Sequence, residues 1–216
     1  MTPEILLAAY SQGLFPMADS ANSDDVHWYC PEQRGQLSIS QMHIPRRLQK
    51  SVRQMKIAGA PYEIHINRNF RAVIQSCAQI NQSRNETWIN RKIIDAYCDL
   101  HESGHAHSVE TWQGKNLIGG LYGVSIGAAF FGESMFSCAR DASKVALVHL
   151  VVRLHHAGFQ ILDTQFTNDH LEQFGVYELG YKKYLTRLKP ALDLQCYFDF
   201  KAPNERALVS AYLSGR

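Results

Sequence analysis

The 216-residue sequence predicts an α+β fold, and three neighbouring stretches carry that prediction. Residues 119–132 intersperse glycines with apolar, β-favouring side chains, which indicates two strands of a glycine-rich sheet. Residues 142–157 present a broad apolar surface at helical spacing, and Gly158 then ends the predicted helix. Residues 159–165 form the next predicted strand, so strands, a helix and a strand follow one another around the glycine-rich centre.

Residues 1–60 predict a small N-terminal lobe ahead of that sheet. Pro3–Ser11 has apolar residues at helical spacing, with Thr2 suited to the N-cap. Gln41–Met55 has basic residues at the same spacing. The run Gly59-Ala60-Pro61 interrupts that pattern, and we expect the domain boundary there.

The same pattern rules predict the remaining elements and the fold of the larger domain. The expected strands are 62–66, 109–112, 117–124, 177–179 and 194–200, and the expected helices are 69–77 and 91–100. We expect an acetyltransferase-like (GNAT-like) mixed-sheet domain over 61–200 and a C-terminal tail over 201–216. Coenzyme A users cradle pyrophosphate with a glycine-bearing loop that opens a helix. Residues 138–141, which precede the helix, contain no glycine, so a small-molecule N-acetyltransferase is the weaker alternative.

The net charge of +2 conceals a strongly basic segment. Residues 46–92 carry ten Lys or Arg against Glu63 and Glu86, whereas the rest of the chain is acidic. Such a segment is expected of a protein that binds a polyanion, with RNA the first candidate, although a solvated helix face remains an alternative. The candidate cations are Arg46, Arg47, Lys50 and Arg84.

Aromatic residues are interleaved with these cations. Trp88 lies close to Arg84 and Arg91, which is the pattern of a nucleic-acid end held by stacking and phosphate contacts. Trp28, beside Tyr29 and Pro31, is a second candidate for stacking on a base. A tryptophan in such a position more commonly packs between two lobes than stacks on a base.

Polar groups at two strand ends are the candidate catalytic residues. Glu133 follows an apolar strand directly, and a buried carboxylate there is costly unless something binds it. Asp163 and Gln165 are two residues apart, so a regular strand would place both on one face, where they could orient an amine and a carbonyl. The alternatives are a turn acid at Glu133 and an acid at Asp163 that caps the helix expected after Asn168.

Composition argues against a metal protein and a membrane protein. His101-Glu-Ser-Gly-His105 matches a zinc-binding pattern that works only on a continuous helix, and Gly104 makes that helix improbable. No apolar run approaches the roughly 18 to 20 residues of a membrane span, and no basic-then-apolar leader opens the chain. Five scattered cysteines without a CxxC pair fit a reducing compartment. We therefore expect a cytoplasmic protein with no metal and no membrane association.

Eight motifs in unbroken order resemble one family. They are Tyr10-Ser-Gln-Gly-Leu-Phe-Pro-Met17, Trp28-Tyr-Cys-Pro31 with Arg34-Gly35, Thr87-Trp-Ile89, Gly104-His-Ala-His-Ser108, Gly119-Gly-Leu-Tyr-Gly123, Gly132-Glu-Ser-Met-Phe-Ser137, Ala142-Ser-Lys144, and Leu162-Asp-Thr-Gln165 with Asn168-Asp-His170. Together they are similar to the leucyl/phenylalanyl-tRNA-protein transferase family over about residues 3 to 190.

The resemblance implies a cofactor-free transfer of Leu, Phe or Met from the 3′ end of tRNA. The acceptor would be the N-terminal amine of a protein or peptide that begins with Arg or Lys, which marks the protein for N-degron degradation. We expect a monomer. A related transferase with a different acceptor, the N-acetyltransferase and a non-catalytic RNA-binding module remain alternatives.

The resemblance also assigns roles to residues. It implies that Asp163 and Gln165 are the catalytic acid and amide, with Glu133 as the motif glutamate. We expect Asp163, acting through Gln165 or directly, to orient and deprotonate the acceptor amine. We expect Glu133 to hold the positively charged acceptor or neighbouring polar groups in register. Substrate-binding roles fall on Trp28, Trp88 and Tyr97 for adenosine, on Leu121, Phe130, Leu150 and Leu154 for the aminoacyl side chain, and on Ser134 and Asn168.

Overall fold

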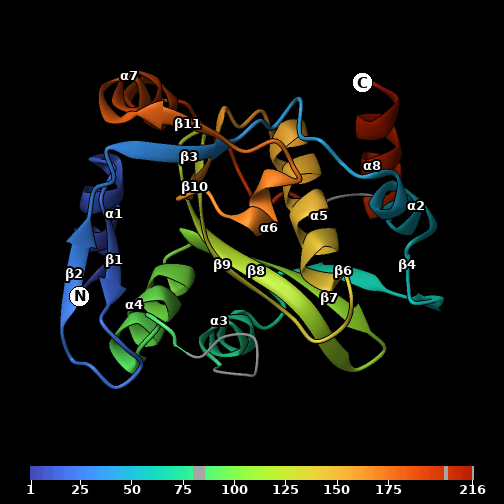
Figure 1. Cartoon of the computed structure of the whole chain (residues 1–216), viewed down its shortest axis with the longest axis horizontal. Helices are drawn as coiled ribbons and strands as arrows, with labels where there is room; N and C mark the ends of the chain where they lie inside the picture. Colours follow the sequence, from blue (N-terminus) through green and yellow to red (C-terminus); the bar gives the residue numbers. More distant parts are fainter. Residues whose placement is uncertain (80–85, 202–203, 216) are drawn as a thin grey trace.

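One mixed sheet of seven strands organises the molecule, in a computed structural model that describes residues 1–79, 86–201 and 204–215 (Figure 1). In spatial order its strands are β11 (Tyr177–Gly180), β3 (Gln33–Leu37), β10 (Ile161–Gln165), β9 (Ala129–Ser137), β8 (Asn116–Ile126), β7 (Ala106–Gln113) and β6 (Glu63–Ile66). Only β9 and β10 run parallel, and every other neighbouring pair in this sheet is antiparallel. The α+β prediction with a mixed sheet is confirmed, while the likeness to acetyltransferases stays a prediction.

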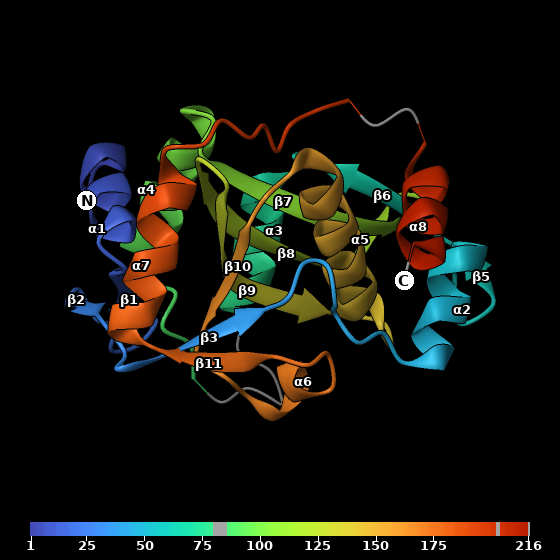
Figure 2. The same ribbon diagram turned by 90° about the horizontal axis from the view of Figure 1, so that it is seen from above.

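Helices cover both faces of this sheet (Figures 1 and 2). They are α1 (Pro3–Ser11), α2 (Arg46–Gln54), α3 (Phe70–Ala78), α4 (Arg91–Glu102), α5 (Ala142–Ala157), α6 (Asp169–Glu172), α7 (Tyr181–Leu192) and α8 (Glu205–Ser214). One apolar core joins the sheet to α2, α5 and α8, and a second core joins it to α1, α3, α4 and α7. Adjacent strand residues alternate between the cores: Phe130 belongs to the first and Phe131 to the second.

Glycine permits the close contact that positions α5. A Cβ on Gly119 of β8 would lie 2.6 Å from the Cβ of Ala142, the first residue of α5. The helix can therefore begin directly on the strand, as the glycine-rich sequence suggests. Gly158 ends α5 with φ +81°, the left-handed conformation expected of a helix-terminating glycine.

The first 60 residues contribute one strand to the main sheet. Two small hairpins, β1 (Phe15–Ala18) with β2 (Val26–Tyr29) and β4 (Lys56–Ile57) with β5 (Ala60–Pro61), lie outside the main sheet. The strand between them in sequence, β3, lies inside it, between β11 and β10. The boundary at residue 60 stays a prediction.

The C-terminal region differs from the expected strand and tail. Residues 194–200 form no strand, and the end of the chain carries α8. Leu208, Val209 and Tyr212 of α8 are buried in the same core as α5. Glu205 accepts a hydrogen bond from the buried Arg153 of α5 at 2.7 Å, a long-range contact that local sequence pattern does not reveal.

Candidate active site

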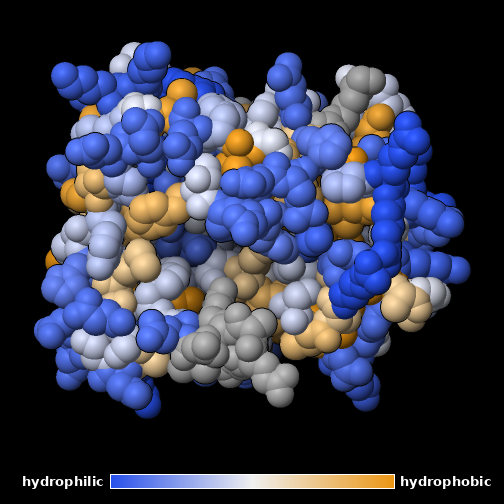
Figure 3. Space-filling model, viewed as in Figure 1, coloured by the Kyte–Doolittle hydropathy of each residue, from blue (hydrophilic) through white to orange (hydrophobic). Residues whose placement is uncertain are grey.

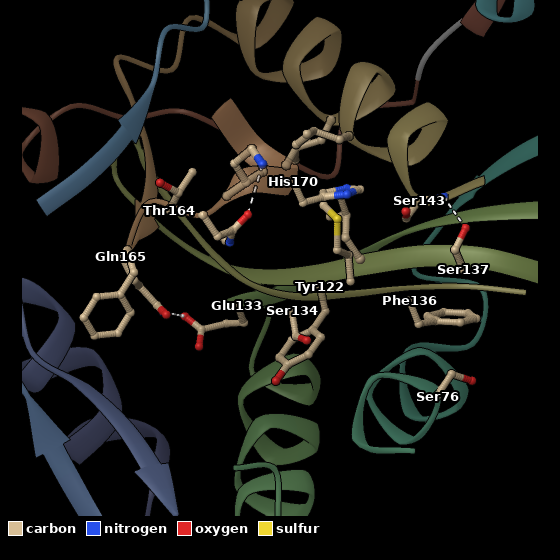
Figure 4. A pocket seen from close by; sticks show the side chains of 18 of the residues that line it. Ser76, Tyr122, Glu133, Ser134, Phe136, Ser137, Ser143, Thr164, Gln165 and His170 are labelled. Carbon is tan, nitrogen blue, oxygen red and sulfur yellow. Dashed lines mark hydrogen bonds between the residues drawn. The ribbon is translucent and has the colours of Figure 1, made fainter. Parts of the chain in front are cut away.

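The two parallel strands separate where the candidate site lies. β10 pairs with β9 only through residues 161–163 and 129–131, and the strands part beyond them. Glu133 and Gln165 follow these paired segments, and Gln165 Nε2 donates to Glu133 Oε1 across the gap at 2.8 Å (Figure 4). A cavity of about 810 Å³ surrounds this pair. The molecular surface is hollowed near the middle of the face in Figure 3, where pale and orange residues border the hollow.

The cavity has an apolar part and a mixed polar and aromatic part. Apolar side chains come from the sheet, α5 and α6: Leu121, Met135, Leu147, Leu150, Leu162 and Leu171. The other part includes Met17, Ser76, Gln79, Trp88, Tyr122, Ser134 and Phe136. Figure 4 shows Tyr122 and Ser134 pointing from the sheet toward α4, with Ser76 on α3 beside Phe136. Glu133 and Gln165 also line this cavity.

Glu133 is held by three donors. Tyr10 donates to Oε1 at 2.7 Å, Tyr97 donates to Oε2 at 3.1 Å, and Gln165 completes the set. The hydroxyls of Tyr10 and Tyr97 also contact each other. Burial raises the pKa of Glu133 to about 7, against the lowering effect of these hydrogen bonds. A carboxylate with a pKa near neutrality can exchange protons with an amine at physiological pH.

Asp163 is enclosed on every side. Arg34 Nε lies 2.9 Å from both carboxylate oxygens, Tyr184 donates to Oδ2 at 2.5 Å, and the backbone N–H of Gln165 donates to Oδ1 at 2.7 Å. Asp163 is 0% exposed and Arg34 is 1% exposed. Asp163 is absent from the cavity wall, so its carboxylate faces protein groups and not the space available to a substrate.

The backbone turns sharply at Gln165 and directs its side chain into the gap. Gln165 has φ +63°, and the pairing of β10 with β3 shifts register between Asp163 and Gln165. The expectation of a regular strand face shared by both residues is therefore wrong at this point, because an irregularity interrupts the alternation. Gly35 of β3 lies against the irregularity: a Cβ there would lie 2.7 Å from Thr164 Oγ1. The hydrogen bond to Asp163 closes this turn.

The structure brings most, but not all, of the predicted binding residues to the cavity. The predicted residues on its wall are Glu133, Gln165, Trp88, Leu121, Ser134, Leu150 and Asn168. Phe130 and Leu154 are fully buried and absent from the wall. Tyr97 is also buried and absent from the wall, and its hydroxyl donates to Glu133.

Trp28 lies apart from this set. It is 39% exposed on β2, where it pairs with Pro16, one residue from Met17 of the cavity wall. Because neighbouring strand residues face opposite sides, Trp28 and Met17 occupy opposite faces of this hairpin. Stacking of Trp28 on the terminal adenosine stays a prediction, and the absence of Trp28 from the cavity wall argues against it.

Three of the four predicted cations lie on α2, which approaches the end of α5 that borders the cavity. Arg46, Arg47 and Lys50 are exposed on α2, and Arg47 Nε lies 4.0 Å from Asp141 Oδ2. Asp141 immediately precedes α5, and Ser143 in the first turn of α5 lines the cavity. The fourth predicted cation, Arg84, lies outside the described residues.

The zinc-like sequence pattern does not form a zinc-binding helix. α4 ends at Glu102 and Gly104 has φ +84°, so His101 and His105 do not share a helix face. Within residues 1–79, 86–201 and 204–215 no cluster of three or more His, Cys, Asp or Glu could hold a metal ion. In the same ranges no helix is long and apolar enough to cross a membrane.

Comparison with known proteins identifies the family of this chain. The family described as leucyl/phenylalanyl-tRNA protein transferase matches residues 36–189, and its N-terminal domain matches residues 1–32. The chain belongs to this family. It is 50% identical over 203 residues to a leucyl/phenylalanyl-tRNA–protein transferase of Maricaulis maris, covering 94% of this chain and 91% of the relative.

Two other relatives carry the same name. The Paramagnetospirillum magneticum protein is 48% identical over 202 residues, covering 94% of each chain. The Caulobacter vibrioides protein is 51% identical over 191 residues, covering 88% of this chain and 86% of the relative. The family model over residues 36–189 covers Glu133, Asp163 and Gln165.

Sequence reasoning missed several residues that this member of the transferase family uses to build the site. Arg34 and Tyr184 enclose Asp163, and Tyr10 supports Glu133. These partners lie 21 to 129 residues from the carboxylates they contact, so no local spacing could pair them. Leu147 could have been found, because it precedes Leu150 by three residues and therefore shares its helix face.

Proposed function

We propose that this aminoacyltransferase moves Leu, Phe or Met from the 3′ end of tRNA to the N-terminal amine of proteins that begin with Arg or Lys. The observation that carries the proposal is the hydrogen-bonded pair of Glu133 and Gln165 in a cavity that is also lined by a set of apolar side chains. An apolar pocket favours Leu, Met or Phe over a small or charged side chain by roughly 1.5 to 3 kcal/mol. The polar and aromatic part, with Trp88, suits the terminal adenosine, and Leu121 and Leu150 suit the aminoacyl side chain.

The reaction is an aminolysis of an ester. The acceptor nitrogen forms a bond to the ester carbonyl carbon, the attacking amine loses a proton, and the bond to the ribose oxygen breaks as that oxygen gains a proton. Catalysis therefore needs a group that accepts one proton and returns it, beside a group that orients the amine.

Glu133 suits the proton transfer and Gln165 suits the orientation. The carboxylate of Glu133 lies on the cavity wall with a pKa of about 7. Gln165 directs Nε2 to Glu133, and within the described part of the chain its Oε1 accepts no hydrogen bond, which leaves it able to accept one from the amine.

Asp163 acts through Gln165 in this proposal. Its enclosed carboxylate stabilises the turn that aims the amide and does not meet the amine. Of the two routes that the sequence leaves open for Asp163, this division of roles favours the one through Gln165, because Asp163 is fully buried and absent from the cavity wall.

The wider setting follows from the substrates. Transfer to basic N-termini would mark proteins for N-degron degradation in the cytoplasm, and one cavity on one chain is sufficient for a monomer to act. The exposed cations of α2 would contact the tRNA backbone beyond its terminal nucleotide.

A transfer assay tests the proposal. Radiolabelled Leu-tRNA is incubated with the protein and with peptides that begin with Arg, Lys, Asp or Glu. We expect product with Arg and Lys only. Product with Asp or Glu would indicate a related transferase with another acceptor, and acetylation of the same peptides by acetyl-coenzyme A would indicate the N-acetyltransferase. Tight tRNA binding without turnover on any peptide would indicate an RNA-binding module.

A further inference from the structure

The cavity wall carries a second carboxylate besides Glu133. Asp169 is the first residue of α6, and among the described lining residues it and Glu133 are the only acids. No Lys or Arg is present on that described wall. A cationic substrate group that enters the cavity would therefore find two acids and no side chain of like formal charge.

Glu133 is poorly suited to bind a cationic side chain. Its two oxygens already accept hydrogen bonds from Tyr10, Tyr97 and Gln165. At neutral pH the carboxyl group is also charged in only a fraction of the molecules, because its pKa is about 7. A guanidinium needs a stable, accessible carboxylate as its partner.

Asp169 has the properties that Glu133 lacks. It is exposed, and within the described part of the chain its carboxylate accepts no hydrogen bond and forms no ion pair. Its neighbours do not neutralise it. Lys144 already pairs with Asp141 at 3.6 Å and donates to Gln173 at 3.1 Å. Partial burial and the nearby Lys144 lower the pKa of His170, which disfavours the charged form of that ring.

The position of Asp169 is defined by the turn that follows Gln165. Asn168 caps α6, with its Oδ1 accepting from the backbone N–H of Leu171 at 3.0 Å. Four residues of extended chain span at most about 14 Å. The chain turns at Gln165, where φ is +63°, so the distance from Gln165 to Asp169 is shorter than this limit.

We infer that Asp169 recognises the basic side chain of the acceptor's first residue, while Gln165 and Glu133 act on its amine. This inference rests on the proposed transfer to N-terminal Arg or Lys. It assigns acceptor specificity to α6 and separates it from the residues that carry out the chemistry. Arg would pair with both oxygens of the carboxylate, and Lys with one.

The test compares matched acceptors and matched variants. Three peptides differ only in the first residue, which is Arg, Lys or citrulline, the uncharged counterpart of Arg. The proteins are wild type, Asp169→Asn and Glu172→Gln, the last removing another exposed acid of α6 that does not line the cavity. Values of kcat/KM are measured at two ionic strengths.

We expect wild type and Glu172→Gln to prefer Arg over citrulline by about tenfold or more, the scale of a charge-assisted hydrogen bond. In Asp169→Asn the preference should fall to about one through a higher KM for the Arg peptide, with unchanged transfer to citrulline. Higher salt should reduce the wild-type preference. A fourth protein, Asp169→Lys, is tested with two further peptides that begin with Glu or Gln. It should favour the Glu peptide, because the charge at this position is reversed.

The outcomes separate the inference from the function on which it rests. If Asp169→Asn keeps the wild-type preference, or if wild type shows none, Asp169 does not recognise the side chain. If wild type transfers to no peptide at all, the proposed function itself fails. An equal loss of preference in Glu172→Gln would point to the general negative field of α6 and would overturn the assignment to one residue.

Discussion

The carboxylate of Asp163 accepts a hydrogen bond from the backbone N–H of Gln165, two residues further along the same strand. This bond joins a fully enclosed acid to the residue whose amide faces the cavity. Through this bond, the buried contacts that Arg34 and Tyr184 make with Asp163 help to fix the position of the side chain that we propose orients the amine. Stability and activity are therefore coupled at this point of the sheet.

Asp163→Asn should destabilise the fold as well as the reaction. Removing one partner of a buried ion pair leaves Arg34 uncompensated, which costs about 3 to 5 kcal/mol in the free energy of unfolding. Urea unfolding measures the loss, and Asp169→Asn, at an exposed position, should change stability by less than about 0.5 kcal/mol. A stable Asp163→Asn protein without turnover would instead place Asp163 in the chemistry.

The rate of transfer should depend on pH through Glu133. Its pKa lies at about 7, above its ordinary value of 4.5, and a base acts only when deprotonated, so single-turnover rates should rise as pH increases through about 7. Tyr10→Phe removes a hydrogen bond that lowers this pKa, and should move the midpoint to higher pH. Glu133→Gln should lower the rate by about 10² to 10⁴ and abolish this limb. A limb that keeps the wild-type midpoint in Glu133→Gln, distinct from the titration of the acceptor amine at about 8, would assign the base elsewhere.

The two tryptophans should differ in their effect on the donor. Trp88→Ala should weaken binding of an aminoacyl-adenosine by about 1 to 3 kcal/mol, the usual contribution of stacking on a base. Trp28 is absent from the cavity wall, so Trp28→Ala should change this affinity by less than about 0.5 kcal/mol, as expected of a surface position. Calorimetry with both variants measures the difference. Equal losses would place Trp28 in the donor site.

Donor choice should depend on Leu150 and not on Leu154. Leu150 lines the cavity, and Leu150→Ala should alter the ratio of Leu to Phe transfer by about 1 to 3 kcal/mol, because the pocket is enlarged. Leu154 is fully buried outside the cavity, so Leu154→Ala should lower stability by about 2 to 5 kcal/mol and leave the ratio unchanged. Competition between Leu-tRNA and Phe-tRNA reports the ratio. An altered ratio in Leu154→Ala would extend the pocket beyond its present walls.

Binding of tRNA should depend on salt through α2. Replacing Arg46 and Arg47 by Gln should reduce the slope of log affinity against log salt by up to about 2, because each phosphate contact contributes about one. Lys182→Gln with Lys183→Gln removes the same charge from α7 and serves as the control. Equal changes in both double variants would indicate a general charge effect and no specific contact with α2.

Local sequence pattern determined the elements that depend on neighbours in the chain. The apolar surface and terminal glycine of 142–157 predicted α5 with its observed bounds, and Pro3–Ser11 likewise matched α1. Their places at strand ends, together with the family resemblance, directed attention to Glu133 and Gln165, which are joined by a hydrogen bond at the cavity. Local pattern did not predict α7, because its basic side chains obscure a short apolar face formed by Tyr184 and Leu188.

The site itself was decided by tertiary structure. A strand pattern reports the alternation of faces, but not that β9 and β10 part after three paired residues or that φ becomes positive at Gln165. The partners of the two carboxylates come from α1, β3, α4 and α7, and hydrogen bonds over such separations depend on how the helices pack on the sheet. For this reason the sequence identified Asp163 as a candidate, and only packing revealed that its carboxylate is enclosed while that of Glu133 lines the cavity.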